Sequence, residues 1–408
     1  MNEKNKVSLS AQIDSRYIDV LDGIRAISIL FVAWFHYWQL SWLMPIYNTK
    51  VFEGIGVNKI DLNWIPQTGY EYVDVLLLLS GFCLFLPYAR EMIYGDKTPS
   101  NKIFYKKRVA RIIPSYLFCL LFTLFVFILP NKQYSSFASL IKDLFTHLTF
   151  THNLSKETYL QSSFNGVLWT LAVEAQFYLI FPLLAKAFKK KPLYTYVSMV
   201  FASFLFIHCL VIPKQGGEIG MWINQLPAFL GVYANGMLGA LIFVYLSKHI
   251  QREKVKSIFF TMVAVGSIFA LRYLFKYSLA TSDKINVWQV KNRYLVSLLV
   301  LLIIISTALS LSAFRKIFSN RIMRFLSTIS FNFYIWHQFI GAKLKEYKIP
   351  YWEGDDPYGS MMSDKKWQWT YTVIIWVVSL LVATILTYGL EKPMAKFILK
   401  GKSTKLKK

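Results

Sequence analysis

The sequence predicts an all-α polytopic membrane protein, a bundle of about ten transmembrane helices with both termini in the cytoplasm. Its 408 residues are 55% hydrophobic and only 17% charged, and a water-soluble fold of this length could not cover so much apolar surface. The apolar residues also fall in runs of about 20, the length that crosses about 30 Å of hydrocarbon as a helix. Lysine and arginine gather in alternate connecting segments, as in loops on the cytoplasmic side.

The apolar runs place ten candidate spans along the chain. No cleavable signal peptide is expected, because the first 18 residues are polar and the run that follows is too long for one. The segment 139–151 is too short and too polar to cross, so we expect an interfacial or re-entrant piece. The spans are 24–44, 70–89, 112–130, 166–186, 193–212, 222–246, 257–276, 294–312, 325–342 and 369–389.

The distribution of basic residues tests this topology. With a cytoplasmic N-terminus, the inside segments hold 29 Lys and Arg and the outside segments 14. This bias favours an even number of spans in a multi-pass protein of the plasma (inner) membrane. It also explains the net charge of +24 without a nucleic-acid partner. Cys83, Cys119 and Cys209 all lie in apolar runs and predict neither a disulfide framework nor a metal site.

Three ionisable side chains from three spans are predicted to reach one depth. His36 and His337 each lie 12 residues beyond the inner end of their span, and Glu174 lies eight residues below the outer end of its own. At about 1.5 Å per residue, all three reach the outer half of the membrane. A histidine beside a carboxylate suits a general base, although a single buried histidine is more often a structural core residue.

The second span opens with acidic residues and contains a pair of small ones. Glu71 and Asp74 lie near the outer face, where they would either line the mouth of the same cavity or anchor the helix at the interface. Ser80 and Gly81 follow within the span, and such a small pair lets another helix approach closely.

An arginine pair marks the inner end of the third span. Arg108 and Arg111 are three residues apart and therefore share one face of a helix. Two guanidinium groups on one face suit a phosphate or pyrophosphate. The alternative is ordinary positive charge at the cytoplasmic side of the membrane.

Six segments of the chain, in order, resemble the acyltransferase family three, integral-membrane enzymes that O-acylate bacterial surface glycans. The resemblance covers the whole chain, and ten spans is also the family's number. It implies one transmembrane acyltransferase domain over residues 1–392 and a basic cytoplasmic tail over 393–408. The segments are LDGIRAISILFVAWFH, YEYVDVLLLLSGFCLF, KKRVARIIPSY, LWTLAVEAQFYLIFP, FNFYIWHQF and LTYGLEKPMAKF.

The resemblance implies roles for individual residues. His36 would be the catalytic base and Arg25 its companion in the first span. Glu174 would be the carboxylate of the fourth span, and His337 and Asp74 are further candidates, either catalytic or structural. The family usually has a proline shortly after the late Trp-His, whereas Gln338 and Phe339 stand here, which weakens the role of His337. Ala175 stands where the family often has a second acidic residue, so Glu174 would act without a neighbour in its span.

Arg108 and Arg111, together with Lys107, would bind a cytoplasmic acyl-CoA, most simply acetyl-CoA, and no metal is implied. The acceptor would be a glycan or lipid-linked sugar outside the membrane. It would take the acyl group directly or from a separate extracytoplasmic acyl-carrying protein. The rival interpretation is a glycan exporter or proton-coupled transporter on the same scaffold, because buried His and Glu also suit a proton relay.

Overall fold

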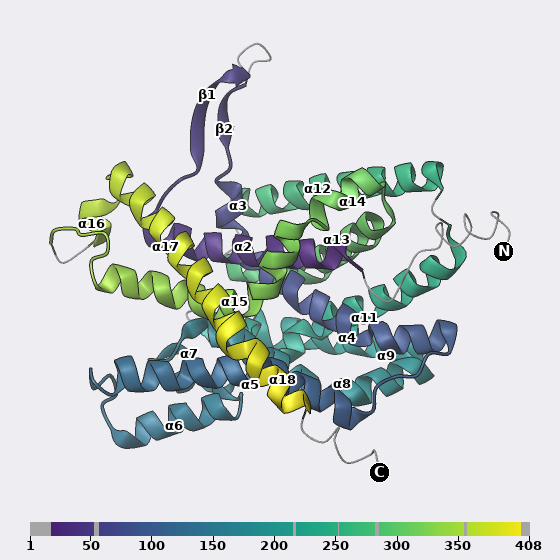
Figure 1. The fold of residues 1–408 in the computed structure, drawn as a ribbon, viewed down its shortest axis with the longest axis horizontal. Helices are drawn as coiled ribbons and strands as arrows, with labels where there is room; N and C mark the ends of the chain where they lie inside the picture. The colour runs from purple at the N-terminus through teal and green to yellow at the C-terminus, as the bar shows by residue number, and fades with distance from the viewer. Residues whose placement is uncertain are drawn as a thin grey trace.

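The structure, a computed structural model, describes residues 18–52, 57–214, 218–251, 253–281, 285–354 and 357–400. In these residues the chain is predominantly helical, which confirms the predicted all-α class. Most of the long helices run side by side, whereas α17 (Lys365–Leu386) and α18 (Lys392–Lys400) cross them obliquely (Figure 1). The long helices are α2 (Val20–Ser41), α4 (Tyr72–Tyr94), α5 (Asn101–Thr123), α8 (Trp169–Lys190), α9 (Pro192–Phe206), α11 (Leu226–His249), α12 (Lys254–Ala280), α13 (Ile285–Leu309), α15 (Arg321–Glu346) and α17 (Lys365–Leu386).

Short elements join or extend these helices. The π-helical turns Leu124–Ile128, Ile207–Val211 and Thr387–Glu391 continue α5, α9 and α17. The first part of the predicted tail (393–408) belongs to helix α18 (Lys392–Lys400), and residues 401–408 lie outside the described part. The remaining short helices are α3 (Trp64–Gln67), α6 (Phe137–Leu148), α7 (Lys156–Leu160), α10 (Ile219–Ile223), α14 (Ser312–Phe318), α16 (Pro357–Met361) and the single 3-10 turns Gly69–Glu71, His152–Leu154 and Gly166–Leu168.

Nine helices of the described chain are long and apolar enough to cross a membrane. They correspond to the first eight predicted spans and the tenth. The ninth predicted span forms α15, whose 26 residues are also long enough to cross. This helix is less apolar than the other nine because it contains polar residues, among them Ser330, Asn332 and His337. These side chains are buried inside the bundle, where α15 packs against α2 and α17.

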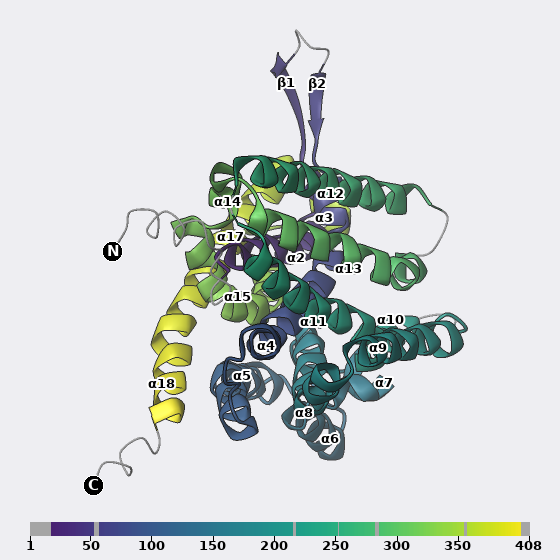
Figure 2. The same cartoon turned by 90° about the vertical axis from the view of Figure 1, so that its right-hand side faces the viewer.

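A β-hairpin between the first two spans was not predicted. Strands β1 (Ile46–Phe52) and β2 (Val57–Asp61) pair antiparallel, with Ile46 opposite Asp61 and Asn48 opposite Lys59. The hairpin projects from the helical body in both views (Figures 1 and 2). It connects the end of α2 to α3 and so to the start of the second span.

Helices α4 and α11 approach each other closely at the centre of the bundle. A Cβ atom on Gly236 of α11 would lie 2.3 Å from the Leu78 backbone oxygen of α4, and one on Gly81 would lie 2.8 Å from the Tyr233 oxygen. Such close approach of backbones is typical of small residues at membrane helix interfaces. On one side of α11 lie α12 and α13, and on the other α8 and α9 (Figure 2). The closely packed pair α4–α11 therefore lies at the centre of the bundle, and the neighbouring helices pack around it.

The polar segment between the third and fourth spans folds as α6, an amphipathic helix. Phe137 on its outer face is 76% exposed, whereas its other face covers a buried polar cluster. In that cluster the ring of His147 stacks on His152 with 3.9 Å between centroids, and Nδ1 of His147 lies 3.0 Å from Oδ1 of Asp143. The Tyr134 hydroxyl donates to the same carboxylate. The contacts in this cluster therefore hold α6 against the loop that leads into α8.

We expect acid to destabilise this cluster. Burial and the neighbouring His147 hold the pKa of His152 well below its usual value of 6.5. Below about pH 6.5 the unfolded chain binds a proton that the folded chain excludes, so the stability that neutral His152 contributes is present above that pH and declines below it. Thermal unfolding in detergent should show a midpoint that falls between about pH 7.5 and 5.5, less steeply for His152→Phe. If the thermal midpoint fell equally steeply with pH in the wild type and in His152→Phe, the expectation would be contradicted.

Candidate active site

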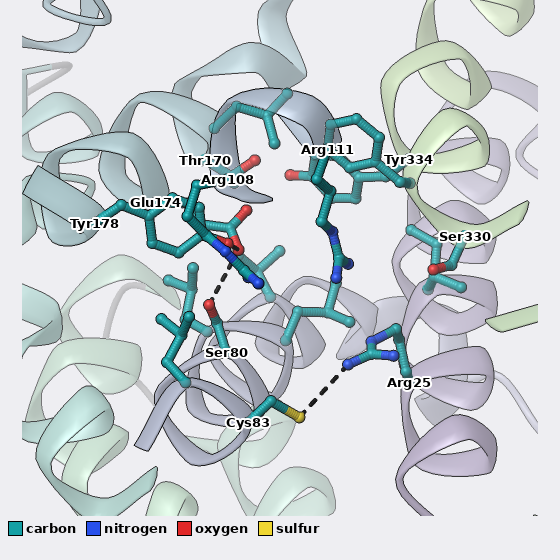
Figure 3. A pocket seen from close by; sticks show the side chains of 17 residues that line it. Arg25, Ser80, Cys83, Arg108, Arg111, Thr170, Glu174, Tyr178, Ser330 and Tyr334 are labelled. Atoms are coloured by element: carbon teal, nitrogen blue, oxygen red, sulfur yellow. Dashed lines mark hydrogen bonds between the residues drawn. The ribbon is translucent and has the colours of Figure 1, made fainter. Parts of the chain in front are cut away.

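A cavity with three arginines lies among α2, α4, α5, α8 and α15, with about 740 Å³ of empty space that includes open solvent. We call it the inner cavity. Its charged lining consists of Arg25 from α2, Arg108 and Arg111 from α5, and Glu174 from α8. The three guanidinium groups point into the same space (Figure 3). Three cations against one carboxylate leave an excess of positive charge, which favours an anionic ligand.

The acidic member of this group is held by hydroxyl groups. The Ser80 hydroxyl of α4 donates to Oε1 of Glu174 over 3.0 Å, and the Tyr178 hydroxyl donates to the same oxygen. Tyr178 also packs against Arg108, whose guanidinium carbon lies 5.5 Å from the ring centroid. Two neutral donors thus hold one oxygen of Glu174, and among the described residues no ion pair joins this carboxylate to Arg108 or Arg111.

Each arginine is positioned by the helix that carries it. Arg108 and Arg111 are one turn apart on α5 and face the same way, as their spacing predicts. Arg25 makes longer contacts: an ion pair with Oδ1 of Asp22 over 3.7 Å, 3.4 Å to Oγ of Ser327 and 3.7 Å to Sγ of Cys83. Lys107, which the resemblance places with the arginine pair, is exposed and does not line the cavity. A side chain one residue along a helix points about 100° away, so it reaches a different face.

A second, larger cavity contains His36, with about 2200 Å³ of empty space that likewise includes open solvent, and we call it the outer cavity. Its lining combines aromatic rings with side-chain amides, and the acidic residue in it is Asp74. Val73 and Tyr334 line both cavities, so the two spaces adjoin there. The aromatic residues are Phe35, Trp38, Tyr70, Tyr159, Trp169 and Tyr334, and the amides are Gln39, Gln67, Asn224, Asn286, Gln289 and Gln338.

The two predicted histidines lie side by side, with 5.2 Å between ring centroids. Nδ1 of His36 lies 3.3 Å from Oε1 of Gln39. An amide oxygen only accepts, so Nδ1 carries the proton and Nε2 of His36 keeps a free lone pair. His337 is fully buried behind it, and its Nδ1 donates to the Tyr334 carbonyl oxygen over 2.7 Å. A lone pair on Nε2 in an open cavity is what a general base requires.

The structure separates residues that were predicted to act together. His36 and His337 adjoin, but Glu174 bonds to Ser80 and Tyr178 in the inner cavity and is not hydrogen-bonded to either histidine. Arg25, the predicted companion of His36, also lines the inner cavity, about three helical turns away. Equal depth was the only premise for convergence, and depth says nothing about the direction in which a side chain faces.

Asp74 belongs to a buried ion pair. Its Oδ2 accepts from Nε of Arg293 on α13 over 2.8 Å, and both side chains are nearly inaccessible, at 1% and 2%. Arg293 also donates to the Ile223 carbonyl oxygen. Asp74 therefore lines the outer cavity from inside the bundle. Glu71 is buried as well and lines neither cavity.

Sequence reasoning missed the hydroxyl groups that line the inner cavity. Tyr178 lies four residues after Glu174, and Tyr334 lies three residues before His337, so helical spacing could have placed each on the face of its neighbour. In the described part of the chain, no group of three or more His, Cys, Asp or Glu side chains could hold a metal ion.

Comparison with known proteins adds a family and several relatives. A family model described as an acyltransferase domain matches residues 18–390. A putative O-acetyltransferase of Staphylococcus aureus (strain COL) is 23% identical over 339 residues, which are 79% of this chain and 50% of the relative. The O-acetyltransferase OatA of Staphylococcus aureus (strain NCTC 8325 / PS 47) is 22% identical over 86% of the chain and 55% of its own length.

A third relative differs in length from these two. The putative acetyltransferase ORF330 of Acidianus two-tailed virus is 24% identical over 77% of the chain and 80% of its own length. The chain spans about half the length of the staphylococcal relatives that it matches. No solved structure matches the chain.

Proposed function

The chain belongs to the acyltransferase family whose domain matches residues 18–390, and from that premise we propose that it moves an acyl group from acyl-CoA to a glycan hydroxyl across the membrane. The family match confirms the resemblance found in the six sequence segments. The observation that carries the proposal is the pair of adjoining cavities, one lined by three arginines and the other containing His36.

The inner cavity is proposed to bind the donor from the cytoplasm. The phosphates of CoA carry several negative charges, and Arg25, Arg108 and Arg111 offer planar, permanently charged donors that suit them. The acyl end of the donor, in the simplest case acetyl, would then extend toward Val73 and Tyr334, where the inner cavity meets the outer one.

The outer cavity is proposed to bind one sugar unit of the acceptor. Aromatic faces pack against the apolar faces of sugar rings, and side-chain amides can donate to and accept from hydroxyl groups. Asp74 is already paired with Arg293, and no Lys or Arg lines this cavity among the described residues. These features favour an uncharged sugar unit, free or lipid-linked, over an anionic one.

His36 is proposed as the general base. Its Nε2 takes the proton of the acceptor hydroxyl while the hydroxyl oxygen attacks the thioester carbonyl carbon. The carbon–sulfur bond then breaks, and the departing CoA thiolate takes the proton from His36. A site enclosed by helices limits the competing hydrolysis of the thioester by water. His337 packs behind His36 and restrains its ring, with 5.2 Å between the centroids.

Transfer of radiolabelled acetyl from acetyl-CoA to a neutral glycan in proteoliposomes tests the proposal. Donor and acceptor are supplied on opposite sides, and the glycan is then recovered and counted. Label on the glycan is the expected result. An exporter or a proton-coupled transporter would move glycan or protons and leave the glycan unlabelled, which would refute the acyl-transfer proposal.

We expect CoA to protect Cys83 from alkylation, because the thiol of Cys83 lines the inner cavity. In a Cys209→Ser background, Cys83 is the accessible thiol, since Cys119 is buried. A CoA concentration ten times the dissociation constant should slow maleimide labelling about tenfold by occupancy alone. Mass spectrometry of the labelled protein measures the rate.

Two matched variants sharpen this experiment. Arg111→Gln should abolish the protection at the same CoA concentration, because it removes a guanidinium group from the cavity lining. Lys107→Gln should retain protection, because its exposed side chain lies outside the lining. Equal labelling of the parent protein with and without CoA would place the donor elsewhere.

A further inference from the structure

The two cavities meet at two side chains, and this junction limits where the reaction can take place. Among the described residues, Val73 of α4 and Tyr334 of α15 line both spaces. This inference rests on the proposed function, in which a thioester arrives from the inner cavity and a hydroxyl from the outer one. The reacting carbonyl must then lie beside these two residues. Val73 is apolar, so Tyr334 supplies the polar group of the junction.

The hydroxyl groups of the inner cavity differ in how their protons are used. The Ser80 and Tyr178 hydroxyls donate to Glu174. The Thr170 hydroxyl donates to the Val167 carbonyl oxygen, and the Ser330 hydroxyl to that of Ser327. The Thr170 hydroxyl is the hydrogen-bonding neighbour of Tyr334, and because its own proton goes to Val167, it can only accept from Tyr334. A substrate oxygen would replace Thr170 as that acceptor. Tyr334 is therefore the hydroxyl in this lining that is best placed to donate to a ligand.

The position of Tyr334 is fixed relative to the proposed base. Its backbone carbonyl oxygen accepts from Nδ1 of His337 over 2.7 Å, and its ring centroid lies 5.6 Å from that of His337. His337 in turn lies against His36. Tyr334 is 8% exposed, and Figure 3 shows its side chain at the edge of the inner cavity. A phenol held in this way is pre-organised, because little rearrangement is needed when charge develops.

We propose that Tyr334 is a further catalytic residue, whose hydroxyl donates a hydrogen bond to the carbonyl oxygen of the acyl thioester at the cavity junction. When the acceptor hydroxyl attacks, the carbon–oxygen double bond opens and negative charge collects on that oxygen. Tyr334 stabilises the oxyanion and keeps its own proton throughout. The double bond re-forms as the carbon–sulfur bond breaks, and the proton held by His36 goes to the CoA sulfur.

The variant Tyr334→Phe tests this assignment, because it removes the hydroxyl and keeps the ring between the cavities. Loss of one oxyanion donor lowers kcat by about 10²–10³-fold, so we expect a fall of that size with the KM for the donor nearly unchanged. Protection of Cys83 by CoA should persist, which shows that the variant is folded and binds donor. Tyr37→Phe is the matched control: Tyr37 is buried against His337 and lines neither cavity, so its rate should stay within a few fold.

A spectroscopic measurement tests the same bond without turnover. In the absence of acceptor, the carbonyl stretch of bound acetyl-CoA, labelled with carbon-13, should lie at lower frequency in the wild type than in Tyr334→Phe. An unchanged kcat or an unchanged stretch would overturn the assignment. The assignment would also be overturned if Tyr334→Phe lost activity only in proportion to its loss of Cys83 protection by CoA. If the wild type itself transfers no acetyl, the proposed function fails first, and the two failures are thus distinguishable.

Discussion

Replacing His36 with alanine should reduce acyl transfer by about 10²–10⁴-fold, the usual contribution of a general base. Nε2 of His36 has a free lone pair, because Nδ1 donates to Oε1 of Gln39. Without the imidazole, the acceptor hydroxyl must attack while still protonated. The neighbouring His337 cannot substitute, because it lines neither cavity and is fully buried.

The measurement is the initial rate of glycan acetylation in proteoliposomes, together with protection of Cys83 by CoA. We expect His36→Ala to lose transfer and keep protection, since His36 lies in the outer cavity and the donor phosphates are proposed to bind in the inner one. His249→Ala, at the exposed end of α11, is the matched control and should keep the wild-type rate. Full activity of His36→Ala would remove this residue from the mechanism.

Substituting leucine for Gly236 should prevent the chain from folding. A Cβ at this position would lie 2.3 Å from the Leu78 backbone oxygen and 2.8 Å from the Phe82 backbone nitrogen. Backbone atoms of α4 cannot move aside as a flexible side chain can, so α4 and α11 would have to separate. Overpacking of a well-packed core lowers the free energy of unfolding by about 1–3 kcal/mol. We expect a clash with backbone atoms to lower it by an amount at or above the top of that range.

Size-exclusion chromatography in detergent and the thermal midpoint report this effect. We expect aggregated Gly236→Leu protein, or protein with a sharply lowered midpoint. Gly266→Leu is the control, because a Cβ on Gly266 of α12 would meet nothing within 4 Å. Monodisperse Gly236→Leu protein with the wild-type midpoint would show that the α4–α11 contact is looser than the structure describes.

The helical architecture follows from the sequence because lipid leaves few alternatives. A run of about 20 apolar residues can satisfy its backbone polar groups in hydrocarbon only as a helix, so the spans could be placed from apolar length. The hairpin at Ile46–Asp61 was not predicted, because outside the hydrocarbon several backbone conformations compete. Helix α15 was predicted despite its polar residues, and the structure places these against α2 and α17.

The candidate site was only partly predictable, for a geometric reason. Residue numbering predicted one depth for His36 and His337, and the structure places their rings in contact. Residue numbering also predicted the depth of Glu174. The direction of the Glu174 side chain depends on how α8 is rotated against α4, which residue counting does not specify. The partner of Asp74, Arg293, lies 219 residues away on another span, and no local pattern connects the two.

The cluster of Arg25, Arg108 and Arg111 has an electrical consequence in the proposed orientation. In the proposed function, the cluster would retain the ionic portion of the donor at the cytoplasmic end, and only the uncharged thioester would extend beyond it. Carrying one elementary charge through the bilayer would change the energy by about 2.3 kcal/mol per 100 mV, yet here almost none is carried. Turnover is therefore nearly electroneutral, and vesicles depolarised with an ionophore should acetylate glycan as fast as energised ones.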